Sequence, residues 1–385
     1  MDQSNNFLVW AAILNGKNNL MIVITTRSFP PELGGMQSLM GGLAIHLNAF
    51  HPIKVLADSF SGDQDYDKKN NFETNRMGGL KILKKYRKFN LLKEIIKNNP
   101  IKAIVADHWK SIELITNNIS DKIPILCLIH GKEINHPTNS SINRRSINAL
   151  AKTKYIVANS EFTKNLAAEK GFEGNKIHVI NPGINEPQTI SSEVNRQAEE
   201  IFANSDIKII TVSRFDKRKG IDFSLLALKN IQSIYPNFKY VIVGSGDEEE
   251  NLKKTAKNLN LEKNVKFIKN ISLELKNALI KNSNIFLMPT RIEGTSVEGF
   301  GISYIEAAIY GIPSIAGKDG GASDAVKHNQ TGLICNGYDH AEIYDALKNM
   351  IENRKYLELG KNAKEFAKQF YWKEIIKKYA NLLNL

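Results

Sequence analysis

Cysteine is scarce in this sequence of 385 residues, which contains only Cys127 and Cys335. Both lie in apolar or strand-like surroundings, far apart along the chain. Because a disulfide framework needs more cysteines and an oxidising compartment, we expect two buried thiols in a reducing compartment.

Long apolar runs are missing as well. The longest one near the start, Phe7 to Leu14, has eight residues, whereas a membrane span needs about 20. The first residues also lack the basic segment and the cleavage site of a secretory signal. We therefore expect a cytoplasmic protein, with peripheral contact to the inner face of the plasma membrane left open.

Arginine is scarce too, although the chain is strongly basic. Of the 52 Lys and Arg residues only ten are Arg, and the net charge is +12. The sequence has no zinc-ligand spacing, no aromatic motif of the RNA-recognition type and no Arg cluster, so we expect no nucleic-acid partner. Two interpretations of the charge stay open, namely contact with an anionic membrane surface and a Lys-rich composition that reflects codon usage.

Short apolar runs alternate with segments of helical periodicity along the chain. Runs such as Ile101 to Asp107 and Ile123 to Ile129 are continuously apolar, as strands buried in a parallel sheet are. The alternation and the length predict an α/β fold of two Rossmann-like domains. We expect an extension at 1–20, a first domain at 21–188, a second at 189–370, and a final helix at about 371–385 that packs back on the first domain.

Two glutamates eight positions apart, Glu298 and Glu306, flank a Gly-Phe-Gly turn. A buried strand is predicted before them and a helix that ends at Gly311 after them. We therefore expect Glu298 in the strand-to-helix loop and Glu306 in the second turn of the helix. The glycines let backbone N–H groups approach an anion at the helix N-terminus. By spacing alone the pair is either a ligand-binding device or a surface loop with one Glu paired to a Lys.

Three further loops follow predicted strands. Gly34 and Gly35 close a Pro-stiffened loop before a helix, which suits a phosphate but also a simple tight turn. His130 follows a strand at the edge where open α/β sheets bind ligands, although a lone His is usually structural. Arg214 and Lys219 lie in one Gly-terminated loop, which suits a diphosphate but could be only a basic turn.

Two patterns suggest ligands but are incomplete. Gly244 and Gly246 form G-x-G without the third glycine of the dinucleotide fingerprint, so we expect no nicotinamide cofactor. Asp63, Asp65 and Asp67 alternate, but the Gly and Glu that an EF-hand needs are missing. We expect a solvated loop there and no metal site.

Residues 81–97 are predicted to form a helix with one basic face. Ile82, Tyr86, Phe89 and Ile96 share its other face by helical spacing. Such a helix could rest on an anionic membrane. The interpretation that we prefer is a helix of the first domain whose lysines face solvent.

Taken together, the motifs resemble those of glycosyltransferase family 4, retaining enzymes of the GT-B fold in which two Rossmann-like domains face a central cleft. The resemblance covers residues 21–385, and the order of the motifs is its strength, since each one alone is weak. Glu298-Gly299-Phe300-Gly301 with Gly320-Gly321 is similar to the form found in phosphatidylinositol mannosyltransferase-like members. The other matching motifs are Gly34-Gly35, His130-Gly131, Asn159-Ser160, Asn181-Pro182-Gly183, Ser213-Arg214, Lys219-Gly220, Val243-Gly244-Ser245-Gly246, Gly320-Gly321-Ala322 and Thr331-Gly332-Leu333.

The resemblance implies a role for each matched residue. Arg214 and Lys219 would grip the donor diphosphate and stabilise charge on the departing nucleotide. Glu298, with backbone N–H groups of the following turn, would hold the donor sugar and its β-phosphate, and Glu306 would accept hydrogen bonds from the ribose. The remaining implied site residues are Phe300, Gly301, Ile302 and Gly244 for the donor, Gly34 and Gly35 facing it from the other domain, and His130 near the sugar.

The implied reaction moves a hexose, mannose or a similar sugar, from a GDP- or UDP-linked donor to a lipid or envelope-polysaccharide acceptor. It needs no metal and no cofactor beyond this co-substrate. Front-face attack, in which the leaving phosphate takes the acceptor proton, retains the anomeric configuration without a carboxylate nucleophile, and domain closure excludes water. Two alternatives stay open: a nucleotide-sugar 2-epimerase of the same fold, and a catalytically silent subunit that binds nucleotide sugars.

Overall fold

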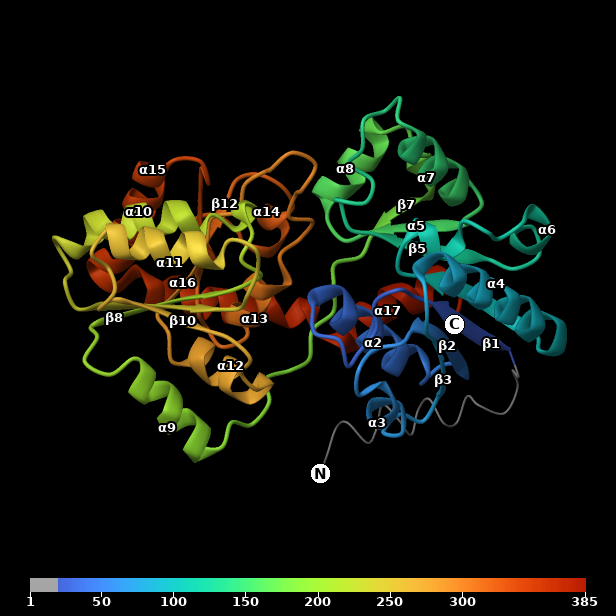
Figure 1. Cartoon of the computed structure of the whole chain (residues 1–385), viewed down its shortest axis with the longest axis horizontal. Helices are drawn as coiled ribbons and strands as arrows, with labels where there is room; N and C mark the ends of the chain where they lie inside the picture. The colour runs from blue at the N-terminus through green and yellow to red at the C-terminus, as the bar shows by residue number, and fades with distance from the viewer. Residues whose placement is uncertain (1–19) are drawn as a thin grey trace. The chain divides into compact units, whose positions relative to one another are not determined.

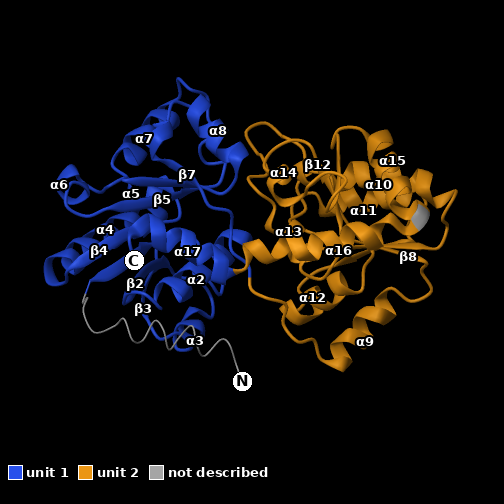
Figure 2. Cartoon of the chain, turned by 180° about the vertical axis from the view of Figure 1, so that it is seen from behind, with its two compact units in different colours: residues 1–184, 372–385 blue, residues 185–371 orange. Residues whose placement is uncertain are grey.

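The computed structural model describes residues 20–385, so the expected extension at 1–20 lies, except for its last residue, outside the described residues. The chain divides into two compact units (Figure 2). Unit 1 contains the residues up to Ile184 together with Trp372–Leu385, and unit 2 is Asn185–Tyr371. Each unit is built on one parallel sheet with helices around it (Figure 1), which confirms the predicted fold class.

The sheet of unit 1 has seven strands in the order β3-β2-β1-β4-β5-β6-β7. Its inner strands are the apolar runs of the sequence, and they are buried because helices cover a parallel sheet on both faces. The strands are β1 Met21–Thr25, β2 Ile53–Asp58, β3 Glu73–Met77, β4 Ile101–Ala106, β5 Ile125–Ile129, β6 Tyr155–Ala158 and β7 Ile177–Val179.

The helices of unit 1 start at well-defined caps where the sequence supplies Ser. The side chains of Ser140 and Ser160 accept backbone N–H groups of Asn143 and Thr163 at 3.1 and 3.0 Å. The helices are α2 Gly35–Leu47, α3 Asp63–Asp67, α4 Lys81–Asn98, α5 Trp109–Ile112, α6 Asn117–Ser120, α7 Ser141–Ala151, α8 Glu161–Glu169 and, from the end of the chain, α17 Trp372–Leu383.

The last helix, α17, packs against α2. The Trp372 indole stacks on the His46 imidazole with ring centroids 5.0 Å apart, and its backbone N–H donates to the Ile184 carbonyl at 3.0 Å. A Cβ at Gly42 would lie 2.3 Å from the indole, so only glycine allows this contact. The aromatic side chain therefore joins the end of the chain to the core of unit 1.

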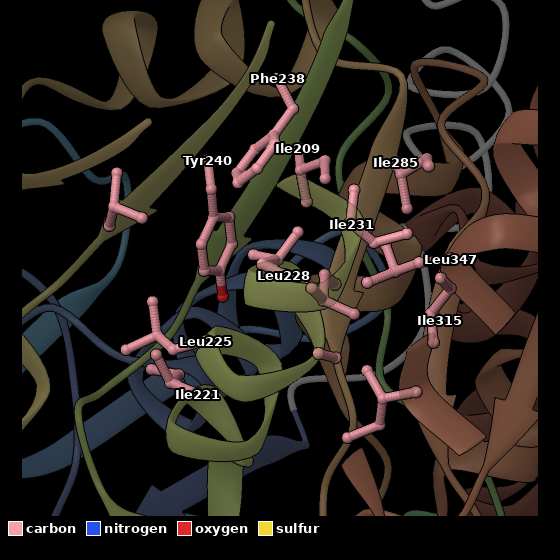
Figure 3. Close-up of a cluster of buried hydrophobic side chains, with 14 of the residues drawn as sticks. Ile209, Ile221, Leu225, Leu228, Ile231, Phe238, Tyr240, Ile285, Ile315 and Leu347 are labelled. Atoms are coloured by element: carbon pink, nitrogen blue, oxygen red, sulfur yellow. The ribbon is translucent and has the colours of Figure 1, made fainter. Parts of the chain in front are cut away.

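The sheet of unit 2 has six strands in the order β10-β9-β8-β11-β12-β13. Figure 3 shows its core, in which Leu225, Leu228 and Ile231 lie beside Ile209 and Tyr240. The strands are β8 Ile207–Val212, β9 Phe238–Val243, β10 Val265–Ile268, β11 Ile285–Met288, β12 Ser314–Gly317 and β13 Gly332–Cys335. The helices are α9 Ser192–Ile201, α10 Ile221–Gln232, α11 Glu249–Asn258, α12 Leu273–Lys281, α13 Ile302–Ala308, α14 Ala322–Ala325, α15 His340–Ile351 and α16 Lys355–Ala367.

Both sheets reverse their direction of growth once. In unit 1 the chain moves outward from β1 to β3 and then returns to β4 on the other side of β1. In unit 2 it moves from β8 to β10 and returns to β11 on the other side of β8. At such a switch point the two loops leaving the carboxyl ends of the adjacent strands diverge, which leaves room for a ligand between them. The loops after β1, β4, β8 and β11 are therefore the candidate site loops.

One expectation about local structure needs correction, and two elements were not predicted. The aspartates at 63, 65 and 67 form the short helix α3 rather than a loop, with Asp67 held by the Arg76 guanidinium at 2.7 Å. The edge strand β3 was missed because a half-exposed edge strand carries no apolar run. The helix α9 was not predicted either, although Val194, Ala198 and Ile201 recur at helical spacing in its otherwise polar sequence.

The expectation of buried thiols is confirmed, since Cys127 and Cys335 are both buried and free. Burial raises the pKa of the Cys127 thiol well above its ordinary value, so this group stays protonated at neutral pH. Within the described residues no helix is both long enough and apolar enough to cross a membrane.

The contact between α17 and α2 gives a stability prediction. Gly42→Ala should lower the free energy of unfolding by about 1 to 3 kcal/mol, because the new methyl group displaces the Trp372 indole. Helix propensity alone would change stability by about 1 kcal/mol in the opposite direction. Urea denaturation followed by tryptophan fluorescence measures the effect. Gly174→Ala is the control, since nothing lies within 4 Å of a Cβ there; equal stability of the two variants would contradict the prediction.

Candidate functional site

The strongest cluster in unit 2 lies at the switch point between β8 and β11. Glu298, in the loop after β11, receives the Arg218 Nη1 at 2.8 Å and also binds the Lys219 ammonium, both from the loop after β8. The three side chains are 13%, 8% and 9% exposed. One carboxylate thus joins the two loops that diverge at this edge of the sheet.

Glycine and a short 3-10 turn position the two cations. Lys217–Lys219 form the turn, and Gly220 follows with a φ of 69° in the left-handed region. A Cβ on Gly220 would lie 2.1 Å from the Pro289 carbonyl oxygen at the end of β11. Only glycine lets the loop after β8 approach β11 so closely, and this approach turns Arg218 and Lys219 toward Glu298.

The cluster keeps its carboxylate charged. Burial alone would raise the pKa of Glu298, but Lys219 and Arg218 together hold it below its ordinary value. Burial lowers the pKa of Lys219, while Glu298 acts against that effect. The Asp216 carboxylate also lies 3.4 Å from Arg218 and 3.7 Å from Arg214, so the three cations Arg214, Arg218 and Lys219 face the two carboxylates of Asp216 and Glu298. This leaves a positive excess, and a positive excess favours an anionic ligand.

Three polar atoms near this cluster have no partner within the described part of the chain. Arg218 Nε, Asp216 Oδ1 and Ser213 Oγ are all buried without a hydrogen bond. Buried polar groups are normally paired, so unpaired ones are typical of a site that receives its partners from a ligand or water. These atoms all belong to the loop after β8.

The structure places Arg214 and Lys219 differently from the predicted pair. The Arg214 side chain is 75% exposed, and its nearest carboxylate is Asp216 at 3.7 Å. The buried neighbour of Lys219 is Arg218, which the sequence analysis missed. In a run of basic residues the sequence does not indicate which side chains turn inward; the left-handed glycine at the end of the turn decides it.

The turn after Glu298 is built around Phe300 and Gly301. Phe300 is buried, with its ring centroid 5.5 Å from that of Phe370. Gly301 has a φ of 88° and precedes α13, where a Cβ would lie 2.4 Å from the Tyr304 ring. Ile302 begins the helix. Packing of Phe300 thus fixes the turn whose N–H groups were predicted to face the donor.

Glu306 lies in the second turn of α13, as predicted. Its carboxylate pairs with the Lys276 ammonium at 2.8 Å and is 31% exposed. A Glu paired to a Lys was part of one of the two interpretations that the sequence left open, namely a surface loop instead of a ligand-binding device. A partly exposed carboxylate beside one lysine can still accept hydrogen bonds from hydroxyl groups on its free side.

Gly244 is explained by packing against the loop after β8. Its φ is 146°, and a Cβ would lie 1.9 Å from the Ser213 carbonyl oxygen. Nearby, the Phe215 N–H donates to the Ser245 carbonyl at 2.8 Å. The G-x-G pattern therefore lets two neighbouring loops of the sheet edge touch through their backbones.

Residues 291–297 form a polar insertion before Glu298, and its first residue, Arg291, is also one that the sequence analysis missed. Its side chain is 4% exposed and forms a fork with Asp222 at 2.8 and 2.9 Å and a bond to Glu293 at 2.7 Å. Its backbone N–H donates to the Arg218 carbonyl at 2.9 Å. Arg291 thus fixes both the insertion and the loop that carries Arg218.

In unit 1, Gly34 and Gly35 are exposed at the junction of the loop after β1 with α2. Two cations, the partly buried Arg76 and the buried Lys88, hold this loop. The Arg76 Nη2 donates to the Pro30 carbonyl at 2.5 Å, and the Lys88 Nζ donates to the Thr26 carbonyl at 2.8 Å. The glycines therefore sit on a loop of defined position.

His130 follows β5 and is tied to the end of β4. Its Nε2 lies 3.0 Å from the Asp107 carbonyl oxygen, so this nitrogen carries a proton. The Asp107 carboxylate accepts the Arg27 N–H at 2.9 Å, which brings the loops after β1, β4 and β5 together. His108, missed by the sequence analysis, is buried beside them, and burial lowers its pKa well below the ordinary value.

Comparison with known families covers nearly the whole described chain. The family model described as Glycosyl transferases group 1 matches residues 193–369, and that described as Glycosyltransferase Family 4 matches residues 33–188. The first match contains all strands of the second sheet, and the second match contains the strands of the first sheet except β1.

Among curated proteins, a GDP-mannose-dependent α-(1-6)-phosphatidylinositol monomannoside mannosyltransferase of Mycobacterium tuberculosis is 25% identical over 94% of this chain and 97% of that protein. A mannosyltransferase of Corynebacterium glutamicum, acting on the monoacylated form of that lipid by its name, is 25% identical over 86% of this chain and 88% of its own.

Among solved structures, HepE from Anabaena in complex with UDP and glucose has a TM-score of 0.76 at 20% identity, covering 95% of this chain and 99% of its own. Sucrose-phosphate synthase from Thermosynechococcus elongatus has a TM-score of 0.78 at 18% identity, covering 95% and 98%. These likenesses show that the two sheets together form the GT-B fold.

The Glu298 carboxylate, which bridges Arg218 and Lys219, gives a second stability prediction. Glu298→Gln should lower the free energy of unfolding at pH 7 by about 3 kcal/mol, because it leaves Arg218 and Lys219 buried without a counter-charge. Glu73→Gln is the matched control: it removes an ion pair with Lys54 whose glutamate is 55% exposed, and it should cost less than about 1 kcal/mol.

The pH dependence of this loss of stability tests whether the charge of Glu298 causes it. Since the pKa of Glu298 is lowered in the folded state, its contribution is fully present above the unfolded pKa of about 4.5 and disappears as the pH falls through the folded value. Denaturation of the parent protein and of Glu298→Gln from pH 7 to pH 3 should therefore show that the difference between their free energies of unfolding shrinks below about pH 4.5. A difference that stays constant with pH would mean that charge is not its cause.

Proposed function

Because this chain belongs to glycosyltransferase family 4 and transfers sugar from a nucleotide-sugar donor, we propose that it moves a hexose to a lipid or envelope-polysaccharide acceptor with retention of the anomeric configuration. The observation that carries the proposal is the buried Arg218–Lys219–Glu298 cluster at the β8–β11 switch point. Its positive excess, beside three unpaired polar atoms, suits the diphosphate of such a donor.

Each unit 2 residue has a task in this proposal. Lys219 and Arg218 stabilise the negative charge that develops on the departing diphosphate. Arg214, exposed on the same loop, is free to reach the phosphates as well. Glu298 orients the two cations and accepts a hydroxyl of the sugar, and Glu306 accepts the ribose hydroxyls.

Backbone groups and unit 1 supply the rest. The N–H groups of Phe300, Gly301 and Ile302 belong to a turn fixed by packing and face the β-phosphate in this proposal. Gly34, Gly35 and His130 lie at the carboxyl edge of the unit 1 sheet, and we retain for them the predicted role beside the sugar.

The relatives support a choice of donor and acceptor. The mycobacterial and corynebacterial proteins are named as GDP-mannose-dependent enzymes that act on phosphatidylinositol mannosides, and HepE was crystallised with UDP and glucose. We therefore propose a GDP- or UDP-linked hexose as donor, with mannose the first sugar to test, and a lipid-linked acceptor. Such an acceptor lies in a membrane, so the proposal includes contact with the inner face of the plasma membrane.

The proposed mechanism is front-face displacement. The acceptor hydroxyl attacks the anomeric carbon from the side of the leaving diphosphate, whose oxygen takes the proton. The cations of the loop after β8 carry the leaving-group charge, a task that metal ions perform in other transferases, so we propose that no metal is required. A 2-epimerase is not favoured, because the relatives are named as transferases. The same names argue against a silent binding subunit.

A substitution within one turn tests the role of the cations. Lys219→Met should lower kcat by about 100- to 1,000-fold, as the loss of one preorganised donor to a developing charge does. Lys217→Met, in the same turn but exposed, is the matched control and should keep its activity. Release of GDP or UDP from the nucleotide sugars, with a phosphatidylinositol mannoside as acceptor, measures the rate. Equal rates of the two variants would refute the assignment.

The same assay separates the alternatives. Incubation with donor alone should return unchanged nucleotide sugar; an epimerised sugar would identify the epimerase. Turnover should survive EDTA, and NMR of the product should show the anomeric configuration of the donor. Nucleotide-sugar binding without turnover on any acceptor would instead support the silent subunit.

A further inference from the structure

An acidic side chain lies inside the loop that is assigned to the donor diphosphate. Asp216 stands between Arg214 and the turn Lys217–Lys219, and its side chain is 36% exposed. A carboxylate repels phosphate oxygens, so its presence among cations that bind a diphosphate lowers the affinity for that ligand. The steps of sugar transfer described above give this carboxylate no task.

The local structure of the turn does not explain the carboxylate either. Asp216 directly precedes the 3-10 turn, a position where an Asp side chain often accepts backbone N–H groups. No side-chain hydrogen bond caps this turn, and within the described residues Oδ1 of Asp216 is buried without a partner. The backbone of Asp216 closes the turn instead, since its carbonyl accepts the Lys219 N–H at 3.0 Å. An uncharged side chain at this position would leave the turn unchanged.

The Arg218 guanidinium has two carboxylate neighbours, and it binds them unequally. Its Nη1 donates to Glu298 at 2.8 Å, whereas its Nη2 lies 3.4 Å from Oδ2 of Asp216. Charge-assisted hydrogen bonds of this kind are normally about 2.7–2.9 Å long, so only the first contact has full strength. The Glu298 side chain is also the more buried one, at 13% exposed. Water therefore screens the Asp216 contact more, and Asp216 is the carboxylate that separates from Arg218 more easily.

Asp216 restrains Arg214 as well. The Arg214 Nη2 lies 3.7 Å from the same Oδ2, and the Arg214 side chain is 75% exposed. One carboxylate oxygen thus faces two guanidinium groups, both of which are assigned to the donor phosphates. A phosphate oxygen that binds these groups must compete with Oδ2 of Asp216 for them.

From these contacts we propose that Asp216 is a displaceable counter-ion, which neutralises Arg214 and Arg218 until the phosphates of the nucleotide take its place. The inference rests on the proposed function, because it concerns the same diphosphate site. Glu298 is the fixed counter-ion of the cluster, and Asp216 is the exchangeable one. Part of the attraction between the cations and the phosphates is spent on displacing Asp216, so this residue weakens the binding of every nucleoside diphosphate.

The effect is larger for the product than for the donor. Loss of the sugar leaves a terminal phosphate on GDP or UDP that ionises further, so the product carries more negative charge than the nucleotide sugar. Repulsion by Asp216 grows with that charge. Asp216 therefore favours release of the spent nucleotide over release of the donor, which matters because product release limits the turnover of many enzymes.

Calorimetric titration of GDP, UDP, GDP-mannose and UDP-glucose in EDTA tests the proposal. Asp216→Asn keeps the shape of the side chain and removes its charge. It should bind the nucleoside diphosphate at least about fivefold more tightly than the parent does, and it should gain less with the corresponding nucleotide sugar. Both gains should shrink at high salt, since salt screens a partly exposed charge. Inhibition of sugar transfer by added GDP or UDP should become stronger in the variant.

Asp206→Asn is the matched control. It makes the same change of net charge at the other end of β8, where Asp206 is exposed directly before the strand. The six residues of β8 separate the two edges of the sheet by about 20 Å. The control should therefore bind all four nucleotides as the parent does, and circular dichroism should show that both variants are folded.

Four outcomes would overturn the proposal. Equal affinity of Asp216→Asn and the parent would mean that the carboxylate does not compete with the phosphates. Weaker binding would make Asp216 a residue that positions the arginines, and weaker binding only in Mg²⁺ would make it a ligand of a metal ion held with the diphosphate. An equal gain in Asp206→Asn would reduce the effect to net charge. Failure of the parent to bind either nucleoside diphosphate is distinct from these results, since it contradicts the proposed function itself.

Discussion

The carboxylate of Glu298 between Arg218 and Lys219 is the interaction on which the candidate site depends. Two buried cations on one loop are stable only with a counter-charge, and the loop after β11 supplies it. Gly220 allows the approach, since its missing Cβ leaves room for the Pro289 carbonyl. Arg291 then fixes the insertion that leads to Glu298, through its fork with Asp222 and its N–H bond to Arg218. The loops are therefore positioned without a ligand, and the positive excess stays available for one.

Cations join neighbouring loops in both units, at the β8–β11 switch point of unit 2 and beside β1, β2 and β3 in unit 1. In each sheet, these cations bond to backbone oxygens or to carboxylates. In unit 1, Arg76 donates to the Pro30 carbonyl, and Lys88 donates to the Thr26 carbonyl and pairs with the Asp58 carboxylate. Lys88 also sets the rotation of α4, so a single buried ammonium determines which residues of this helix face solvent.

The sequence predicted what depends on local pattern. Apolar runs located most of the strands, glycines located the site loops, and Glu298 and Glu306 lie where the strand–turn–helix pattern placed them. It did not predict what depends on tertiary contacts. Whether Arg214 or Arg218 turns inward follows from the left-handed Gly220 and its contact with β11. The exposure of Ile82 follows from the ion pair between Lys88 and Asp58, which are 30 residues apart in sequence. In the sequence, Arg291 looked like an ordinary residue of a polar insertion, because its partner Asp222 is far away along the chain.

The central claim is that the Arg218–Lys219–Glu298 cluster receives the diphosphate of a nucleotide sugar. Calorimetric titration of GDP and UDP into the parent protein and into Arg218→Met tests it most directly, because it measures binding apart from chemistry. The account predicts that at least one nucleotide binds the parent and that the variant binds it at least tenfold more weakly, which corresponds to about 1.4 kcal/mol. Equal affinity of the parent and a folded Arg218→Met variant would contradict it.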